Sequence, residues 1–179
     1  MRDYLFPSEI EKLLKQAKKT SRHNIRNQLI ILIGYRHGLR ASEIADLKFS
    51  DIELEEAKLN CRRLKGSHHN IHPLMGDEIR LIKRWLKIHP TPNGEYIFPS
   101  ERKTRITRQS IWRIIKTLGK DAKLSVPMTT HMLKHSCGYY LADKGYDTRL
   151  IQDYLGHKNI QNTVRYTSTN ANRFKGLWR

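Results

Sequence analysis

One strand-like stretch interrupts a chain whose other apolar residues recur at helical spacing, and this contrast restricts the possible folds. From Asn24 to His37 the apolar residues cover more than one helical face, which predicts a buried helix that Gly38 ends. From Lys58 to Leu74, two strand-like runs flank a turn at residues 65–67. We therefore expect a mainly α-helical fold with a small antiparallel β-sheet, which is an α+β class.

Apolar spacing predicts further helices on both sides of the strand pair. The first follows Ser8, whose spacing to Glu11 matches a capping box, and the others lie within residues 76–88, 101–120, 131–144 and 148–155. The 179 residues suffice for one compact unit. We expect a single domain over residues 1–179, with no other domain before its first helix.

The net charge points to a polyanionic partner. Lys and Arg number 34 against 17 Asp and Glu, a formal charge of +17, and such an excess favours nucleic acid. A membrane partner is not expected, because the longest uncharged apolar stretch, from Gln28 to Tyr35, is far shorter than the ~20 residues of a spanning helix. No secretory signal opens the chain, so we expect a cytoplasmic protein.

Basic residues concentrate between Glu101 and Lys120, where seven Lys and Arg accompany one acidic residue. Ile111, Ile115 and Leu118 form an inward stripe there, so the basic side chains would line the opposite face of a helix. The candidate DNA-contacting residues in this segment are Arg105, Arg108, Arg113, Lys116 and Lys120.

Potential metal ligands are poorly spaced for a zinc site. Cys61 and Cys137 are too few for a disulfide framework. His131 and His135 lie close to Cys137 in sequence, but no second Cys/His pair stands at zinc spacing. We expect no metal and no cofactor.

Side chains that bind phosphate or move protons gather in five short motifs. They are Gly38-Leu39-Arg40-Ala41-Ser42-Glu43, Leu64-Lys65-Gly66, His131-Met132-Leu133-Lys134-His135, Leu155-Gly156-His157 and Thr163-Val164-Arg165-Tyr166. In this order they resemble the tyrosine recombinase (phage-type integrase) family, over nearly the whole chain. The resemblance implies the catalytic-domain fold of that family, without the N-terminal domain that closes a clamp around DNA.

The resemblance also implies a separate role for each of these residues in cutting and rejoining double-stranded DNA. Tyr166 would attack the scissile phosphate to give a 3′-phosphotyrosine, a step that uses neither nucleotide nor metal. A free phenol titrates near pH ~10, so the surrounding cations would have to activate it. The implied phosphate ligands are Arg40, Lys134 and His157; His131 would manage the tyrosine proton, Lys65 would protonate the leaving 5′-oxygen, and Glu43 and His135 would support the site.

Lys134 is a departure from the family, which has arginine at this position. Lysine keeps the charge but lacks the planar fork that makes two parallel hydrogen bonds. Weakened cleavage, or a DNA-binding regulator without cleavage, is therefore an alternative function.

One subgroup of the family is particularly similar, namely the invertases that switch bacterial fimbrial expression. The supporting segments are 131–133, 135–138, 147–157 and 170–174. The likeness implies inversion of a promoter segment between inverted repeats, by a homo-oligomer that forms a tetramer in the synapse, with accessory DNA-bending proteins in the bacterial nucleoid. An integrase or excisionase of a mobile element and a type IB topoisomerase share the chemistry, and only the outcome on DNA separates them.

Overall fold

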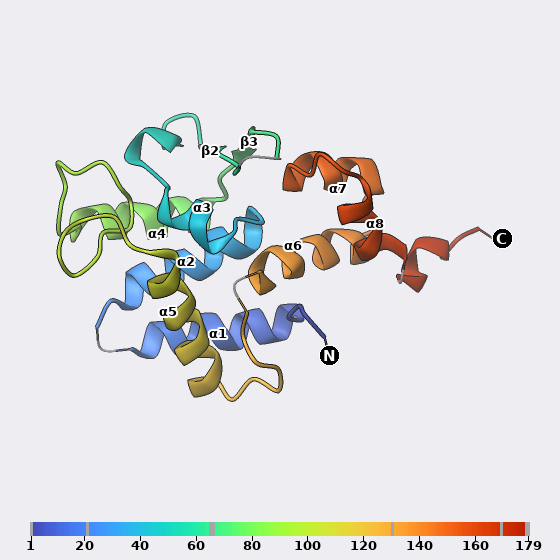
Figure 1. Ribbon diagram of the computed structural model, residues 1–179, viewed down its shortest axis with the longest axis horizontal. Helices are drawn as coiled ribbons and strands as arrows, with labels where there is room; N and C mark the ends of the chain where they lie inside the picture. Colours follow the sequence, from blue (N-terminus) through green and yellow to red (C-terminus); the bar gives the residue numbers. More distant parts are fainter. Residues whose placement is uncertain (1, 21, 65–66, 130, 169, 178–179) are drawn as a thin grey trace.

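Helices dominate the computed structural model, which describes residues 2–20, 22–64, 67–129, 131–168 and 170–177 (Figure 1). Within these ranges the α-helices are α1 (Pro7–Lys19), α2 (Asn24–Arg36), α3 (Ala41–Ala45), α4 (Gly76–Lys87), α5 (Arg108–Asp121), α6 (Met132–Asp143), α7 (Thr148–Leu155) and α8 (Gln161–Ser168). Short 3-10 helices cover Phe49–Asp51 and Ala171–Phe174. This agrees with the predicted α+β class.

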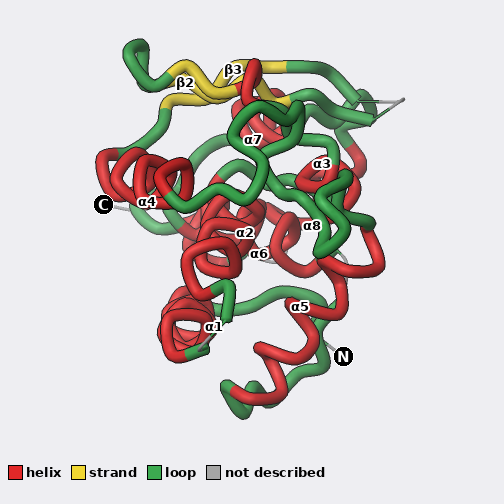
Figure 2. The backbone as a smooth tube through the Cα atoms, turned by 90° about the vertical axis from the view of Figure 1, so that its left-hand side faces the viewer, coloured by secondary structure: helices red, strands yellow, loops and turns green. Residues whose placement is uncertain are grey.

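The described strands form one antiparallel sheet in the order β1 (Ile52–Glu53), β2 (Lys58–Cys61) and β3 (Asn70–Pro73). The predicted strand pair is confirmed, with Leu59 opposite His72 and Cys61 opposite Asn70. Strand β1 was not predicted, because two residues are too few for an alternating pattern to show. Figure 2 shows the sheet at the top of the molecule, with the helices beneath it.

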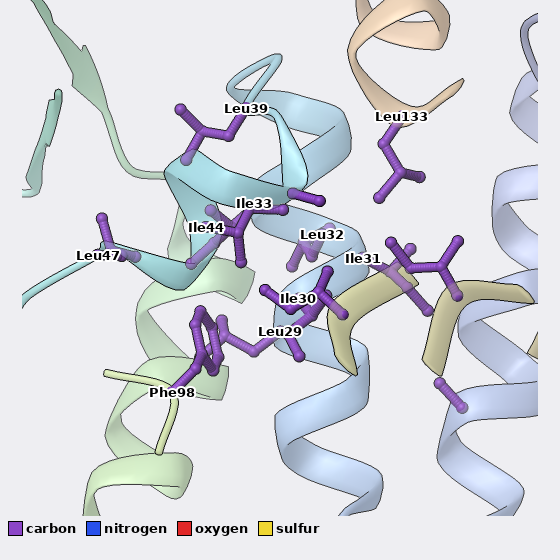
Figure 3. Close-up of a cluster of buried hydrophobic side chains, with 14 of the residues drawn as sticks. Leu29, Ile30, Ile31, Leu32, Ile33, Leu39, Ile44, Leu47, Phe98 and Leu133 are labelled. Carbon is purple, nitrogen blue, oxygen red and sulfur yellow. The ribbon is translucent and has the colours of Figure 1, made fainter. Parts of the chain in front are cut away.

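Helix α2 forms the centre of the core, as its apolar residues predict. Leu29, Ile30 and Ile33 are fully buried there, together with Ile44 from α3 and Phe98 from the segment before α5 (Figure 3). α2 packs against α1, α4 and α6. An apolar side chain on nearly every face of α2 is therefore explained by neighbours on several sides.

Two local predictions were wrong. Helix α1 begins at Pro7, and the carboxylate that accepts the Phe6 N–H is that of Glu9 at 2.8 Å, so Ser8 and Glu11 do not form the capping box. Helical spacing within residues 131–144 places Tyr140 on the core-facing side with Leu133 and Cys137, but Tyr140 is 37% exposed.

Helix α6 connects this core to a second, smaller one. Cys137 and Ala142 of α6 pack with Ile151, Leu155 and Tyr166 from α7 and α8. Figure 1 shows α7 and α8 together beyond the end of α6. α6 thus holds the C-terminal motifs against the part of the chain that bears Arg40.

Among the described residues, none of the helices has the length and apolar character that crossing a bilayer requires.

Candidate active site

Arg40 lies at the junction of α2 and α3, where Gly38 turns the chain. Gly38 has φ +57°, and a Cβ there would lie 2.3 Å from a Leu155 methyl carbon, so only glycine fits without displacement. Arg40 is the N-cap of α3, and both its backbone N–H and its Nη1 donate to the Glu43 carboxylate, at 2.8 and 3.1 Å. Its side chain remains 27% exposed. Glu43 thus orients a guanidinium that solvent or a phosphate can reach.

The Glu43 carboxylate is a buried anchor for several cations and donors. It is 3% exposed and lies within hydrogen-bonding distance of Arg40, Arg63 and the Leu64 N–H. Burial acts to raise its pKa, but the Lys134 ammonium and the Arg40 backbone N–H outweigh it, so the pKa of Glu43 is lower than usual. The residue is therefore ionised at neutral pH, which suits the supporting role predicted for it.

The Lys134 side chain is buried beneath the surface of the candidate site. It is 3% exposed, and its Nζ donates to the Leu155 carbonyl at 2.8 Å. Burial, together with repulsion from Arg63, lowers the pKa of Lys134 to about 7, although Glu43 opposes the shift. A fraction of the molecules near neutral pH therefore lacks the charge that the predicted phosphate ligand needs.

His157 follows the positive-φ Gly156 that ends α7. Its Nδ1 lies 2.9 Å from the Thr163 hydroxyl, which leaves Nε2 available for a ligand. Burial, and secondarily Lys134, lowers the pKa of His157 to about 3, so the ring is a neutral donor at neutral pH.

The segment between β2 and β3 lies against this turn. Ser67 and His157 form an isolated antiparallel bridge, and the Ser67 hydroxyl accepts from Arg40 at 3.4 Å. Lys65, the predicted proton donor to the leaving oxygen, lies outside the described residues. Ser67, two residues further along the chain, contacts Arg40 and His157, two of the predicted phosphate ligands.

Tyr166 lies in helix α8, and only 1% of its surface is exposed. Its ring lies edge-on to Tyr139 at 5.0 Å and nearly parallel to His157 at 6.3 Å. The close approach to α6 depends on Gly138, because a Cβ there would lie 2.5 Å from the tyrosine ring. The ring lies beside His157, one of the predicted phosphate ligands, but it is covered.

The predicted activation of Tyr166 does not occur in this arrangement. Burial raises the pKa of its phenol above the usual value, and Arg165 opposes the rise only partly. Among the described residues, no hydrogen bond joins the Tyr166 hydroxyl to Arg40, Lys134 or His157. The hydroxyl must therefore become exposed to a phosphate before cations can stabilise its anion.

The two histidines of α6 occupy different surroundings. His131 is exposed at the N-cap of α6, and burial of part of the ring, with Arg40 and Arg108 nearby, lowers its pKa. His135 lies with Nδ1 2.9 Å from Asp3, whose carboxylate also pairs with Arg165. Asp3 is a residue that sequence reasoning missed, since nothing in the N-terminal sequence marks it as a neighbour of α6 and α8.

Helix α5 presents the predicted basic face. The exposed basic residues of the helix are Arg108, Arg113, Lys116 and Lys120. The predicted inward stripe of Ile111, Ile115 and Leu118 is buried. Arg105, before the helix, pairs with Asp46. Because Arg108 influences His131, the N-terminal end of this face adjoins the candidate active site.

Arg63 is the main structural residue that the sequence did not reveal. Its guanidinium, fully buried, donates to the carbonyls of Gly38, His37 and Tyr154 at 2.8, 2.9 and 2.9 Å. It thereby ties the α2–α3 junction, the strand pair and α7 together. One arginine among many basic residues carries no sequence signal of burial.

Replacing Arg63 by Ala should lower the free energy of unfolding by about 3 kcal/mol, because several buried carbonyls and Glu43 lose their donor. Arg84→Ala, which removes an exposed arginine of α4, should change it by less than about 0.5 kcal/mol. Urea denaturation followed by circular dichroism measures both. Equal stabilities of the two variants would contradict the role assigned to Arg63.

The structure brings Arg40 and His157 together at Ser67. Glu43 bonds to Arg40 and lies near Lys134, and the Tyr166 ring stacks beside His157. Cationic and neutral donors, an ionised anchor and a hydroxyl nucleophile are the parts that phosphodiester transfer requires. Thr163 belongs to the Tyr166 motif, and no sequence signal marks its hydrogen bond with His157.

Comparisons with known proteins agree with this chemistry. A family model described as "Phage integrase family" matches residues 3–173. The Type 1 fimbriae regulatory protein FimB of Escherichia coli (strain K12) is 47% identical over 180 residues, which cover 99% of this chain and 90% of that protein.

Solved structures show the same fold. A crystal structure of XerA recombinase has a TM-score of 0.84 and 28% identity, and the match covers 99% of this chain and 64% of that one. The XerH site-specific recombinase bound to palindromic difH substrate, a post-cleavage complex, has a TM-score of 0.80 and 26% identity, covering 97% and 52% of the two chains.

Proposed function

The chain belongs to the phage integrase family, and we propose a reaction mechanism and a DNA target for this tyrosine-type site-specific DNA recombinase. Tyr166 attacks the scissile phosphate, and Arg40, Lys134 and His157 hold the phosphate oxygens as charge develops on them. His131 manages the proton of the attacking hydroxyl. Lys65 protonates the departing 5′-oxygen, and a 5′-hydroxyl later reverses the step.

The observation that supports this proposal is the convergence of three sequence-distant motifs. Glu43 accepts from Arg40 in one motif, Lys134 donates to Leu155 in another, and the His157 ring lies beside Tyr166. In-line transfer needs the nucleophile next to fixed donors. No single helix in this chain could supply all of them.

The proposed biological outcome is inversion of a promoter segment that controls fimbrial expression. Its support is the extent of the similarity to FimB, whose name describes a regulator of type 1 fimbriae. We further propose a homo-tetramer on paired inverted repeats, accessory DNA-bending proteins, and a place in the bacterial cytoplasm at the nucleoid. Integration or excision of a mobile element would use the same site on differently arranged repeats.

A nicked suicide substrate tests the cleavage step. Loss of the short fragment beyond the nick traps the phosphotyrosine, so a covalent adduct should appear on a denaturing gel. A plasmid that carries the candidate inverted repeats distinguishes the outcomes, because inversion, excision and relaxation give different restriction patterns. Relaxation without inversion would replace the recombinase proposal by topoisomerase activity.

The second candidate function is a DNA-binding regulator with little or no cleavage. The specific observation in its favour is Lys134, which is buried and has a pKa of about 7, where the family has arginine. Specific binding to inverted repeats without any adduct would establish this alternative.

DNA affinity should fall steeply with salt, because the +17 chain releases counterions from the phosphates that it neutralises. Each contact contributes about −0.9 to the slope of log affinity against log salt, so six contacts would cost about a thousandfold between 50 and 200 mM. Lys116→Ala should reduce the slope by about 1, whereas Lys12→Ala on α1 should not. Fluorescence anisotropy over a salt series measures both, and equal slopes would remove α5 from the DNA interface.

A further inference from the structure

Three buried side chains with metal-ligating atoms meet beside the α2–α3 junction, apart from the residues assigned to cleavage. His37 caps the C-terminal end of α2, Cys61 ends β2 and His72 lies on β3. All are at most 2% exposed, and one ligand atom from each lies within 4.8 Å of the others. The register places Leu59 opposite His72, so Cys61, two residues on, faces the same side of the sheet.

The two imidazole rings turn the same nitrogen toward each other. Their Nδ1 atoms are 3.1 Å apart. The Nε2 of His37 lies 2.9 Å from the buried Glu78 carboxylate, and that of His72 lies 3.0 Å from the Tyr154 carbonyl. A carboxylate and a carbonyl are acceptors, so both Nε2 atoms are best satisfied as N–H donors. The two Nδ1 lone pairs then face each other, and a positive centre between them, a proton or a metal ion, satisfies both.

We propose that this centre is a zinc ion bound by Nδ1 of His37, Nδ1 of His72 and the thiolate of Cys61. Metal-ligating histidines ordinarily donate their other N–H to a carboxylate or a backbone carbonyl, which is the arrangement around both rings here. Zinc–nitrogen distances of about 2.0–2.1 Å in a tetrahedron place two ligand nitrogens about 3.3 Å apart, close to the separation observed.

The surroundings complete the site. The Tyr154 ring stacks on His72 at 3.8 Å and 15°, which fixes the orientation of the imidazole. His37 also lines a surface cavity with Glu78 and Tyr154, so this cavity reaches one edge of the cluster. The Cys61 sulfur lies within 4.8 Å of a ring nitrogen of each histidine.

The ion would join the two segments that bear candidate catalytic groups. His37 precedes Arg40 by three residues, while Cys61 and His72 lie on the strands that flank Lys65 in the sequence. Zinc would therefore stabilise the catalytic arrangement without touching DNA. This inference goes beyond the proposed recombinase function and does not depend on it.

Cobalt titration of the full chain, after removal of metals by a chelator, tests the proposal by absorption spectroscopy. We expect one equivalent of Co²⁺ to give tetrahedral d–d bands and a thiolate-to-cobalt charge-transfer band, both abolished by one equivalent of Zn²⁺. Cys61→Ala should lose the charge-transfer band and bind zinc at least about tenfold more weakly. Cys137→Ala, which removes the other buried cysteine, should behave as the unaltered chain.

Circular dichroism shows whether both variants fold. If Cys61→Ala does not fold, the cobalt spectrum of the unaltered chain alone tests the zinc proposal. Absence of tetrahedral cobalt bands from the unaltered chain would overturn the proposal. Persistence of the charge-transfer band in folded Cys61→Ala would overturn it too. A slowly exchanging imidazole Nδ1 proton that survives equimolar zinc in the NMR spectrum would show instead that the two histidines share only a hydrogen.

Discussion

Tyr166→Phe forms no covalent adduct with a nicked substrate, and its cleavage rate falls by more than about 10³-fold, because the substitution removes the nucleophilic oxygen. DNA affinity and thermal stability stay close to those of the unaltered chain. The ring, which packs against His157, Tyr139 and α6, is retained. Denaturing gels and anisotropy measure the adduct and the affinity.

Tyr139→Phe is the matched control, since Tyr139 lies edge-on to Tyr166 and belongs to the same small core. It should keep cleavage within about threefold, as expected for a side chain whose contribution is packing. An adduct that persists in Tyr166→Phe, or that maps by mass spectrometry to another tyrosine, would remove Tyr166 from its assigned role.

Lys134→Arg should cleave about ten- to a hundredfold faster than the unaltered chain while its DNA affinity changes little. Arginine restores the second hydrogen bond to a phosphate oxygen that gains charge in the transition state, and such a donor is commonly worth roughly 3 kcal/mol. Its charge also survives burial, unlike that of a lysine with a pKa of about 7. Single-turnover cleavage with saturating DNA measures the rate.

The pH dependence of cleavage should differ between the same two proteins. The pKa of Lys134 is lowered to about 7, so the charged form prevails below that pH and the neutral form above it. The second-order cleavage constant, which reports the free protein, should therefore fall through pH 7–8 in the unaltered chain and remain flatter in Lys134→Arg. Lys134→Met, uncharged throughout, should be slow at every pH.

Two outcomes would change the interpretation. If the Arg variant is no faster and the unaltered chain cleaves well, Lys134 is an adapted phosphate ligand. If neither protein cleaves its own inverted repeats, the regulator function takes the lead.

Local patterns sufficed for most of the secondary structure. Helix α7 has the predicted bounds, and α2 and α4 end one residue before them, because amphipathic spacing and a terminal glycine or proline-rich break act over a few residues. The β2–β3 pair followed equally from a turn between two short runs. The motifs indicated the cleavage residues only through a resemblance.

The burial of individual polar side chains could not be predicted from the sequence. The spacing of Lys134 on α6 does not reveal that its ammonium is enclosed with Arg63 and Glu43, and this enclosure sets its pKa. The same holds for Tyr166, whose burial raises the phenol pKa where the motif suggested activation. The histidines and cysteine of the proposed zinc site come from separate elements, so no ligand spacing marks them.

The hydrogen bonds of Arg63 join segments that lie far apart in the sequence. Its carbonyl partners stand 25 residues before it, at Gly38, and 91 residues after it, at Tyr154. Closing such long loops costs chain entropy, which is recovered only when the distant segments have docked. A partly folded or half-synthesised chain would carry Arg40 without the support that positions it. Arg63 therefore fixes the segment that bears Arg40 only after α7 has docked against the strand pair.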